Sequence, residues 1–252
     1  MIEWIAIFGA GALSSFVGSL LGLGGGFILV PILSLQLGFD MKTSIFLSLL
    51  NIFWLSIIKM FQFSDLIQSH RSLVRRLGIF SALGAGISAW IGSRASDESL
   101  NLIFGSILIL VSIYFILDRR PHIQSPIPEA HPLWFGRMMF LFSGGLGGLL
   151  GIGGGILNVP TLHRAFRFDM NLATKLNFPF LFISGGIALL VLFQERREEI
   201  IMISPIIILA LLLGTSMGSM MSSKVKFSSQ SLKVIFSSLL FVLGAIKIYK
   251  AW

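Results

Sequence analysis

Long apolar runs separated by short charged clusters make up most of the chain. A membrane-spanning helix needs about 20 mostly apolar residues, and several runs reach that length. They are too continuous for the alternating pattern of a membrane barrel. The pattern therefore predicts an all-α polytopic membrane protein. The expected apolar segments are 4–21, 26–38, 43–61, 73–93, 99–117, 133–150, 155–163, 171–193, 199–222 and 230–248.

Two of these segments, 26–38 and 155–163, are short. At a rise of about 1.5 Å per residue, neither easily crosses a hydrocarbon core of about 30 Å. Each begins at a cluster of glycines, and irregular backbone is tolerated at membrane depth only where it is buried in protein or lines an aqueous cavity. We expect half-helices or re-entrant segments that begin where the glycines break the chain.

The glycine clusters belong to a passage that occurs twice. Residues 18–41 and 147–170 match at one fixed offset of 129 residues. The identical pairs are Gly18/Gly147, Leu20/Leu149, Leu21/Leu150, Gly22/Gly151, Gly24/Gly153, Gly25/Gly154, Gly26/Gly155, Val30/Val159, Pro31/Pro160, Leu33/Leu162, Phe39/Phe168, Asp40/Asp169 and Met41/Met170. Hydrophobic segments that Gly or Pro interrupts at matching positions of two halves indicate the binding site of a secondary transporter.

The repeat divides the chain into two halves. We expect a first transmembrane repeat at 1–117, a linker with four prolines at 118–132, and a second repeat at 133–252. Each half would hold about four full transmembrane helices and one short or broken helix. If each short segment reverses the chain, the halves are inverted; otherwise they are parallel. The basic cluster around Arg71 and the acidic loop Glu195–Glu199 favour inverted halves, with the basic cluster inside the cell.

The composition agrees with a membrane protein. Only 12% of the residues are charged, against roughly 25% in a soluble domain. The net charge of +8 does not indicate nucleic-acid binding, because the basic residues lie between the spans, as in loops that face anionic headgroups. The absence of cysteine excludes disulfides, thiol nucleophiles and cysteine metal sites. No two histidines have the close helical spacing of a metal pair, so we expect no metal and no cofactor.

A helix that begins inside the membrane offers an oxyanion its unpaired backbone N–H groups and the positive end of its dipole. Glycine also lets a ligand approach the backbone closely. The N-termini at Gly24–Gly26 and Gly153–Gly155 are therefore candidates for an anion site. The alternative is that the glycines only allow close helix packing, for which GxxxG spacing is present at Gly18/Gly22 and Gly147/Gly151.

Lys175 begins a long apolar stretch soon after the second short segment. Ionisable groups within spans are functional candidates by default. We therefore expect Lys175 to supply positive charge to the anion site, with Thr174 and Asn177 as hydrogen-bond donors; the alternative is a lysine that extends to the membrane interface. The amides of Asn51, Asn158 and Asn177 are either substrate ligands or interhelical contacts. The candidate substrate-binding residues are Gly24, Gly25, Gly26, Asn51, Gly153, Gly154, Gly155, Asn158, Thr174, Lys175 and Asn177.

Asp40 and Asp169 follow the two short segments at matched positions. Each would either cap the next helix or couple transport to protons. We favour capping, because Asp directly before an apolar helix is a preferred N-cap residue.

The paired sequences GLGGGFILVP at 22–31 and GIGGGILNVP at 151–160 resemble the TauE/SafE family of anion exporters. The length, the prolines and the helical apolar pattern fit that family over essentially the whole chain. The resemblance implies an inner-membrane carrier for sulfite, organosulfonates or related small organic anions.

Together, these observations predict a multi-pass secondary transporter of the cell inner (plasma) membrane. It would export a small sulfur-containing or organic anion by alternating access, coupled to an ion gradient; an anion channel is the alternative. An intramembrane enzyme is disfavoured because the spans hold no Ser/His/Asp or paired-carboxylate arrangement, and no catalytic residue is assigned. The expected partners are a small anionic substrate and the lipid bilayer, without nucleic acid, and no oligomeric state is predicted.

Overall fold

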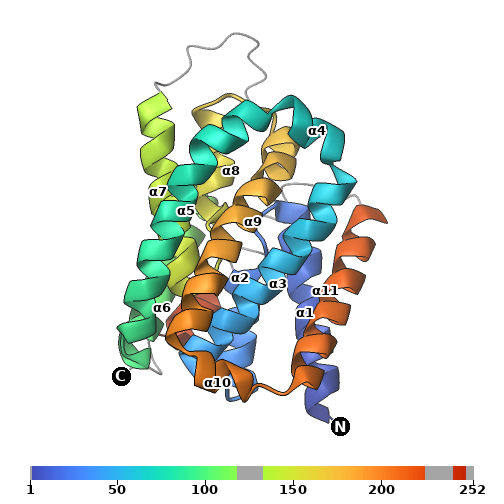
Figure 1. Cartoon of the computed structure of the whole chain (residues 1–252), viewed down its shortest axis with the longest axis vertical. Coiled ribbons are helices and arrows are strands. Elements are labelled where there is room, and N and C mark those ends of the chain that lie inside the picture. Colours follow the sequence, from blue (N-terminus) through green and yellow to red (C-terminus); the bar gives the residue numbers. More distant parts are fainter. Residues whose placement is uncertain (1, 118–132, 225–240, 248–252) are drawn as a thin grey trace.

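The computed structural model describes residues 2–117, 133–224 and 241–247, and within these ranges every regular element is a helix (Figure 1). The predicted all-α fold is confirmed. The helices are α1 (Ile2–Leu21), α2 (Gly26–Pro31), the π-helix η1 (Ile32–Gln36), α3 (Met41–Gln62), α4 (Ser64–Ser69), α5 (Arg71–Arg94), α6 (Asp97–Leu117), α7 (Leu133–Leu150), α8 (Gly155–Arg164), α9 (Met170–Glu195), α10 (Arg197–Ile201) and α11 (Pro205–Lys224). Residues 241–247 are also helical.

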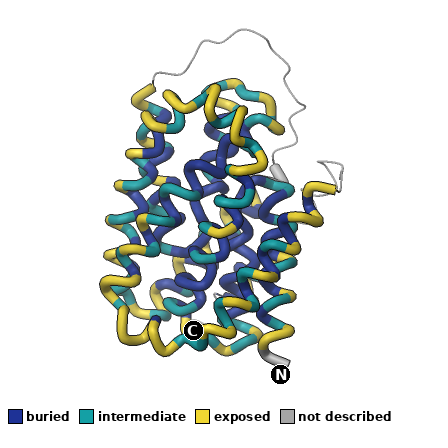
Figure 2. The backbone as a smooth tube through the Cα atoms, turned by 45° about the vertical axis from the view of Figure 1, so that its right-hand side comes forward, coloured by how far each residue is buried: buried dark blue, intermediate teal, exposed yellow. Residues whose placement is uncertain are grey.

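Five of the described helices, α1, α3, α7, α9 and α11, are long and apolar enough to cross a membrane. The helices α5 and α6 form where the apolar segments 73–93 and 99–117 predict them. Burial is concentrated between the helices and exposure on their outer faces and at the two ends (Figure 2). Large apolar side chains such as Leu83, Ile87 and Leu209 are exposed on those outer faces, as expected where lipid surrounds a helical bundle. The chain is a multi-pass membrane protein.

One long predicted segment is divided in the structure. The predicted segment 199–222 is divided into α10 and α11, with Ser204 between them and Pro205 as the first residue of α11. Proline lacks a backbone N–H and its φ suits the first position of a helix, so it begins α11 instead of continuing α10. The predicted linker 118–132 and most of the predicted segment 230–248 lie outside the described residues.

Helices α3 and α9 lie side by side and antiparallel at the centre. Asp40, before the start of α3, pairs with Arg196, after the end of α9. Phe63, after the end of α3, stacks on Phe178 near the start of α9, with ring centroids 6.3 Å apart. The two helices therefore define two ends of the molecule, which we call the α4 end and the α10 end after the short helices found there (Figure 1).

Four of the other long helices join this central pair to form two groups of three. Helices α1 and α11 pack on α3 and run parallel to it, whereas α5 and α7 run parallel to α9. Each group thus combines two helices of one half with one helix of the other. Small residues allow the backbones to approach closely, as in other membrane bundles. A methyl group at Gly144 would overlap the Ser81 carbonyl of α5, and one at Gly214 would overlap the Phe8 carbonyl of α1.

Candidate functional site

Both glycine passages form the same sharp break between a long helix and a short one. The φ angles are positive at matched positions: 68° at Gly22 and Gly151, 89° at Gly24 and 76° at Gly153, and 84° and 68° at the N-cap residues of α2 and α8. Non-glycine residues rarely adopt this left-handed conformation. The glycines therefore allow the chain to leave α1 and α7 abruptly and begin the short helices inside the protein.

The two breaks meet at the centre of the molecule. A side chain at Gly24 or at Gly153 would lie 3.0–3.3 Å from both Ile52 of α3 and Leu181 of α9. Ile52 and Leu181 are themselves fully buried. The glycine passages of the two halves thus lie between the central helices.

Two hydrogen bonds join the halves at this centre. The Ser48 hydroxyl of α3 donates to the Gly151 carbonyl at 2.6 Å, and the Asn177 amide nitrogen of α9 donates to the Gly22 carbonyl at 2.6 Å. Both side chains are fully buried. Sequence reasoning missed Ser48, although it lies 129 residues before Asn177, at the offset of the repeat.

The N-termini of α2 and α8 both point into this buried region. The Leu157 and Asn158 N–H groups of α8 donate to the Gly154 carbonyl, each at 3.2 Å. Within the described ranges, no group accepts a hydrogen bond from the N–H groups of Gly155 and Ile156. A helix start with free N–H groups attracts anions. The structure therefore places the donors of a potential anion site away from bulk solvent.

Each short helix begins against the backbone of the other half. A methyl group at Gly26 would overlap the Gly151 carbonyl oxygen, and one at Gly155 would lie 2.7 Å from the Leu23 Cα atom. The glycines at these two positions are needed for close approach, since neither has a positive φ. The GxxxG glycines have a related role: Gly18 and Gly147 lie against the following glycines of their own passages.

The structure brings two of the three candidate amides to the start of α8. Asn177 lies there, with its amide nitrogen 2.8 Å from the position that a Cβ atom of Gly155 would take. Asn158 is in the first turns of α8 and is 1% exposed. Asn51 lies elsewhere: its Oδ1 atom accepts hydrogen bonds from Ser15 of α1, at 3.0 Å, and from Thr215 of α11. Asn51 therefore links α3 to its neighbouring helices.

Thr174 and Lys175 lie nearer the α4 end. Thr174 packs against Gly22, and its hydroxyl donates to the Met170 carbonyl within α9 at 2.8 Å. The Lys175 Nζ atom lies 5.2 Å from the centroid of the Phe63 ring, within the range of a cation–π interaction. Thr174 and Asn177 are the two hydrogen-bond donors predicted for the anion site, and each donates to a backbone carbonyl.

Lys59 is a buried cation that sequence reasoning did not single out. It is 3% exposed, and its Nζ atom donates to Gln62 Oε1 at 3.1 Å, to the Ser219 carbonyl at 3.1 Å and to Ser222 Oγ at 3.2 Å. These oxygens use the three donors of an ammonium group. The sequence does contain a signal for this residue: Lys59 lies within the apolar segment 43–61, and an ionisable residue inside a membrane span is costly unless it is paired.

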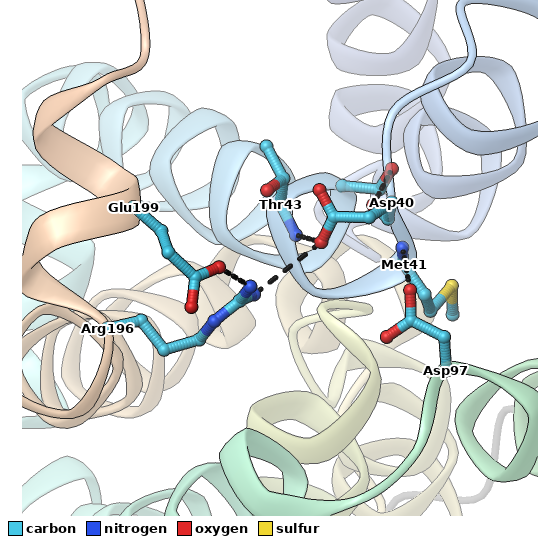
Figure 3. Close-up of polar contacts among 7 residues, drawn as sticks. Asp40, Met41, Thr43, Asp97, Arg196 and Glu199 are labelled. Carbon is cyan, nitrogen blue, oxygen red and sulfur yellow. Dashed lines mark hydrogen bonds and ion pairs between the residues drawn. The ribbon is translucent and has the colours of Figure 1, made fainter.

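Charged groups connect the halves at the α10 end (Figure 3). Asp40 caps α3 by accepting a hydrogen bond from the Thr43 N–H at 2.9 Å, and it pairs with Arg196 at 3.6 Å. Arg196 also pairs with Glu199. Burial by itself raises the pKa of the Asp40 carboxyl, but the hydrogen bonds from Thr43 and the charge of Arg196 outweigh it and hold the pKa below its usual value.

Asp169, at the position that matches Asp40, has simpler contacts. It caps α9 by accepting a hydrogen bond from the Asn171 N–H at 3.1 Å. Both aspartates thus occupy the N-cap positions that the capping interpretation predicts. Only Asp40 also belongs to an ion pair within the described ranges.

These features define a class: a polytopic helical membrane protein with two helix breaks that meet at its centre. The chain belongs to the TauE/SafE family, because the family model described as "Sulfite exporter TauE/SafE" matches residues 7–246. The names of the family and of the relatives support a membrane transporter of this type and not an enzyme. No solved structure matches the chain.

Relatives from three organisms carry similar names. A "Probable membrane transporter protein" of Methanocaldococcus jannaschii is 27% identical over 248 residues, which cover 93% of this chain and 91% of that protein. The "Probable membrane transporter protein YunE" of Bacillus subtilis is 27% identical over 214 residues, covering 73% of this chain and 76% of the relative. One from Xylella fastidiosa is 24% identical over 181 residues, covering 69% and 67%.

Proposed function

We propose that the protein is a secondary transporter that exports a small sulfur-containing or organic anion. One observation carries this proposal: the N-termini of two short helices lie buried at the centre of a membrane protein, where the two glycine passages meet. Helix N-termini stabilise negative charge without a charged side chain. In other transporters, broken helices at the midplane bind substrate in the same way.

Alternating access is the mechanism that this arrangement favours. The group formed by α1, α3 and α11 and the group formed by α5, α7 and α9 meet along the central pair, α3 and α9. Rocking one group against the other would open the space between the two glycine passages to one end of the molecule at a time. At the α10 end, Asp40 and Arg196 hold α3 to the turn after α9. Their ion pair would open when the site faces that end.

The distribution of charge supports an orientation in the membrane. Cations predominate at the α4 end, where the charged residues include Arg71, Arg75, Arg76, Arg164, Arg167, Lys175, Lys224, Asp65 and Asp169. The α10 end holds Asp40, Asp97, Glu98, Glu195, Glu198 and Glu199, together with Lys42, Arg94, Arg196 and Arg197. Lys and Arg are enriched on the cytoplasmic side of membrane proteins. We therefore place the α4 end in the cytoplasm of a cell whose inner membrane holds the protein, and export runs toward the α10 end.

Flux through proteoliposomes tests this function. The full chain is reconstituted, a pH gradient is imposed, and the movement of sulfite, alkyl sulfonates, sulfate and thiosulfate is measured. Saturable, gradient-dependent flux of one anion would support the carrier, whereas single-channel currents would support the anion channel. Folded protein that moves none of these anions would refute the proposed substrate class.

A further inference from the structure

Two amide side chains at the start of α8 have unused hydrogen-bonding atoms. Asn177 is fully buried, and its Oδ1 atom has no hydrogen-bond partner among the described residues. The Asn158 residue is 1% exposed, and neither its Oδ1 nor its Nδ2 atom has a hydrogen-bond partner among the residues that the structure describes. Leaving such groups buried and unpaired is costly. These atoms therefore indicate a ligand that completes their hydrogen bonds.

The unused atom of Asn177 is an acceptor and not a donor. The Gly22 carbonyl oxygen can only accept, so the amide atom that lies 2.6 Å from it must be the nitrogen. The amide oxygen is then the atom left without a partner. The oxygen thus adds an acceptor to the donor role that the sequence predicts for Asn177.

The start of α8 consequently offers both kinds of hydrogen-bonding group. The N–H groups of Gly155 and Ile156 are donors that no described residue uses. The Asn177 oxygen is an unused acceptor on an amide whose nitrogen lies 2.8 Å from the position that a Gly155 Cβ atom would take. An anion whose oxygens all accept would satisfy the donors but would leave the Asn177 oxygen unpaired and close to negative charge. An anion with an adjacent O–H or N–H group satisfies both.

We infer that the site at the N-terminus of α8 selects anions that carry a hydrogen-bond donor next to their charged oxygens, and that Asn158 and Asn177 determine this selection. The inference rests on the proposed function. The ligand class is an oxyanion with an attached hydroxyl, amine or acidic proton. Sulfate and simple alkyl sulfonates are disfavoured.

The selection belongs to the second half of the chain. At the matched positions of the first half, Leu29 replaces Asn158, and Ser48 replaces Asn177. The single hydroxyl of Ser48 already donates to Gly151. The residues of the first half can therefore be used as substitutions at the matched positions of the second half. Asn158→Leu removes both unused atoms, and Asn177→Ser removes the amide oxygen while keeping a donor of the kind that the first half uses.

Two probes of equal charge and similar shape test the inference. The 2-hydroxyethanesulfonate ion has a hydroxyl where 1-propanesulfonate has a methyl group. Binding of each to the purified full chain is measured by titration calorimetry. We expect the hydroxyl probe to bind at least about tenfold more tightly, because a site built around a polar group rejects the analogue that lacks it. The hydrophobic effect alone would favour the methyl probe.

The variants identify the residues responsible. Asn158→Leu and Asn177→Ser should each reduce the preference to about threefold or less, by loss of the same polar contact. Asn171→Ser, an exposed position at the start of α9, should leave it unchanged. Circular dichroism and gel filtration confirm folding, and if one variant does not fold, the other decides.

The outcomes separate the inference from the proposed function. If the wild type binds both probes equally, or if both folded variants keep the full preference, the selection is refuted and the transporter proposal stands. If folded wild type binds neither probe and does not bind sulfite, the proposed anion site fails and the selection fails with it.

Discussion

Ser48 and Asn177 make the same hydrogen bond from opposite halves of the protein. They are 129 residues apart, and each donates at 2.6 Å to the carbonyl of the first glycine in the other half's break, Gly151 or Gly22. Each donor lies on a central helix, α3 or α9. The two bonds therefore fasten each helix break to the half of the molecule that does not contain it.

Removing the Ser48 hydroxyl should destabilise the protein. In Ser48→Ala, the Gly151 carbonyl stays buried and loses its side-chain donor, which we expect to cost about 1 kcal/mol. Unfolding in detergent measures the change. Ser56→Ala is the matched control, because Ser56 is also buried in α3 but donates only within its own helix, to Ile52. Equal stability of the two variants would show that the bond between the halves contributes nothing.

Adding one methyl group at Gly26 should block transport. Gly26→Ala would force the Gly151 carbonyl away and separate the two breaks, so we expect anion flux to fall at least about tenfold, since a small displacement at a site of this kind is enough for a large loss. Gly9→Ala is the control, because a Cβ atom at Gly9 meets nothing within 4 Å. It should keep full flux and gain stability from the higher helix propensity of Ala. Unimpaired flux in Gly26→Ala would contradict the assigned centre.

The ion pair at the α10 end should make stability depend on pH. The pKa of Asp40 lies below its usual 3.8 in the folded protein, so its stabilisation is fully present above that value and is lost as the pH falls through the folded pKa. Asp40→Asn keeps a good N-cap residue and removes the charge. We expect a loss of about 0.5 kcal/mol at pH 7, because the pair is partly exposed to solvent, and a smaller loss near pH 3.

The matched position provides the control for this ion pair. Asp169→Asn removes a carboxylate that caps α9 but forms no ion pair with the described residues. Unfolding by denaturant at pH 7 should show a smaller loss of stability for Asp169→Asn than for Asp40→Asn, because only Asp40 loses an ion pair among the described residues. If both variants behave alike, Arg196 does not stabilise the α10 end.

Replacing Lys175 by methionine should remove anion binding and leave the yield of folded protein intact. Lys175 supplies positive charge near the start of α9, where its ammonium lies over Phe63, and methionine keeps much of the apolar stem of the side chain. Titration with sulfite measures the loss. Lys224→Met, at the exposed end of α11, should bind as the wild type does. Unchanged binding in Lys175→Met would assign Lys175 to the membrane interface.

The long helices and the two helix breaks could be predicted because both depend on local sequence. Apolar runs of sufficient length specify the spans. The triplets at Gly24–Gly26 and Gly153–Gly155 specify the breaks, since few other residues tolerate the positive φ of the first two glycines of each triplet. The repeat also placed the two breaks at equivalent positions, and the structure brings them together between Ile52 and Leu181.

The roles of individual polar residues could not be predicted, because they depend on neighbours that are distant in the sequence. Asn51 and Asn177 both lie in apolar runs, yet one binds Ser15 and Thr215 while the other binds Gly22. Nothing near Lys59 in the sequence indicates that α11 supplies two of its oxygens. The packing of α1 and α11 on α3 decides the contacts of Asn51 and Lys59, and the packing of α9 against the first helix break decides that of Asn177.

The central claim is that the glycine centre faces each side of the membrane in turn, and labelling of one cysteine tests it most directly. The chain has no cysteine of its own, so Ile52→Cys reports only on the fully buried contact of Gly24 and Gly153. A membrane-impermeant maleimide is applied from each side of sealed vesicles, with and without 2-hydroxyethanesulfonate and a pH gradient. The account predicts that the cysteine is labelled from both sides. Any condition that increases labelling from one side should decrease labelling from the other. Labelling from one side only under every condition, or labelling that rises from both sides together, would contradict it.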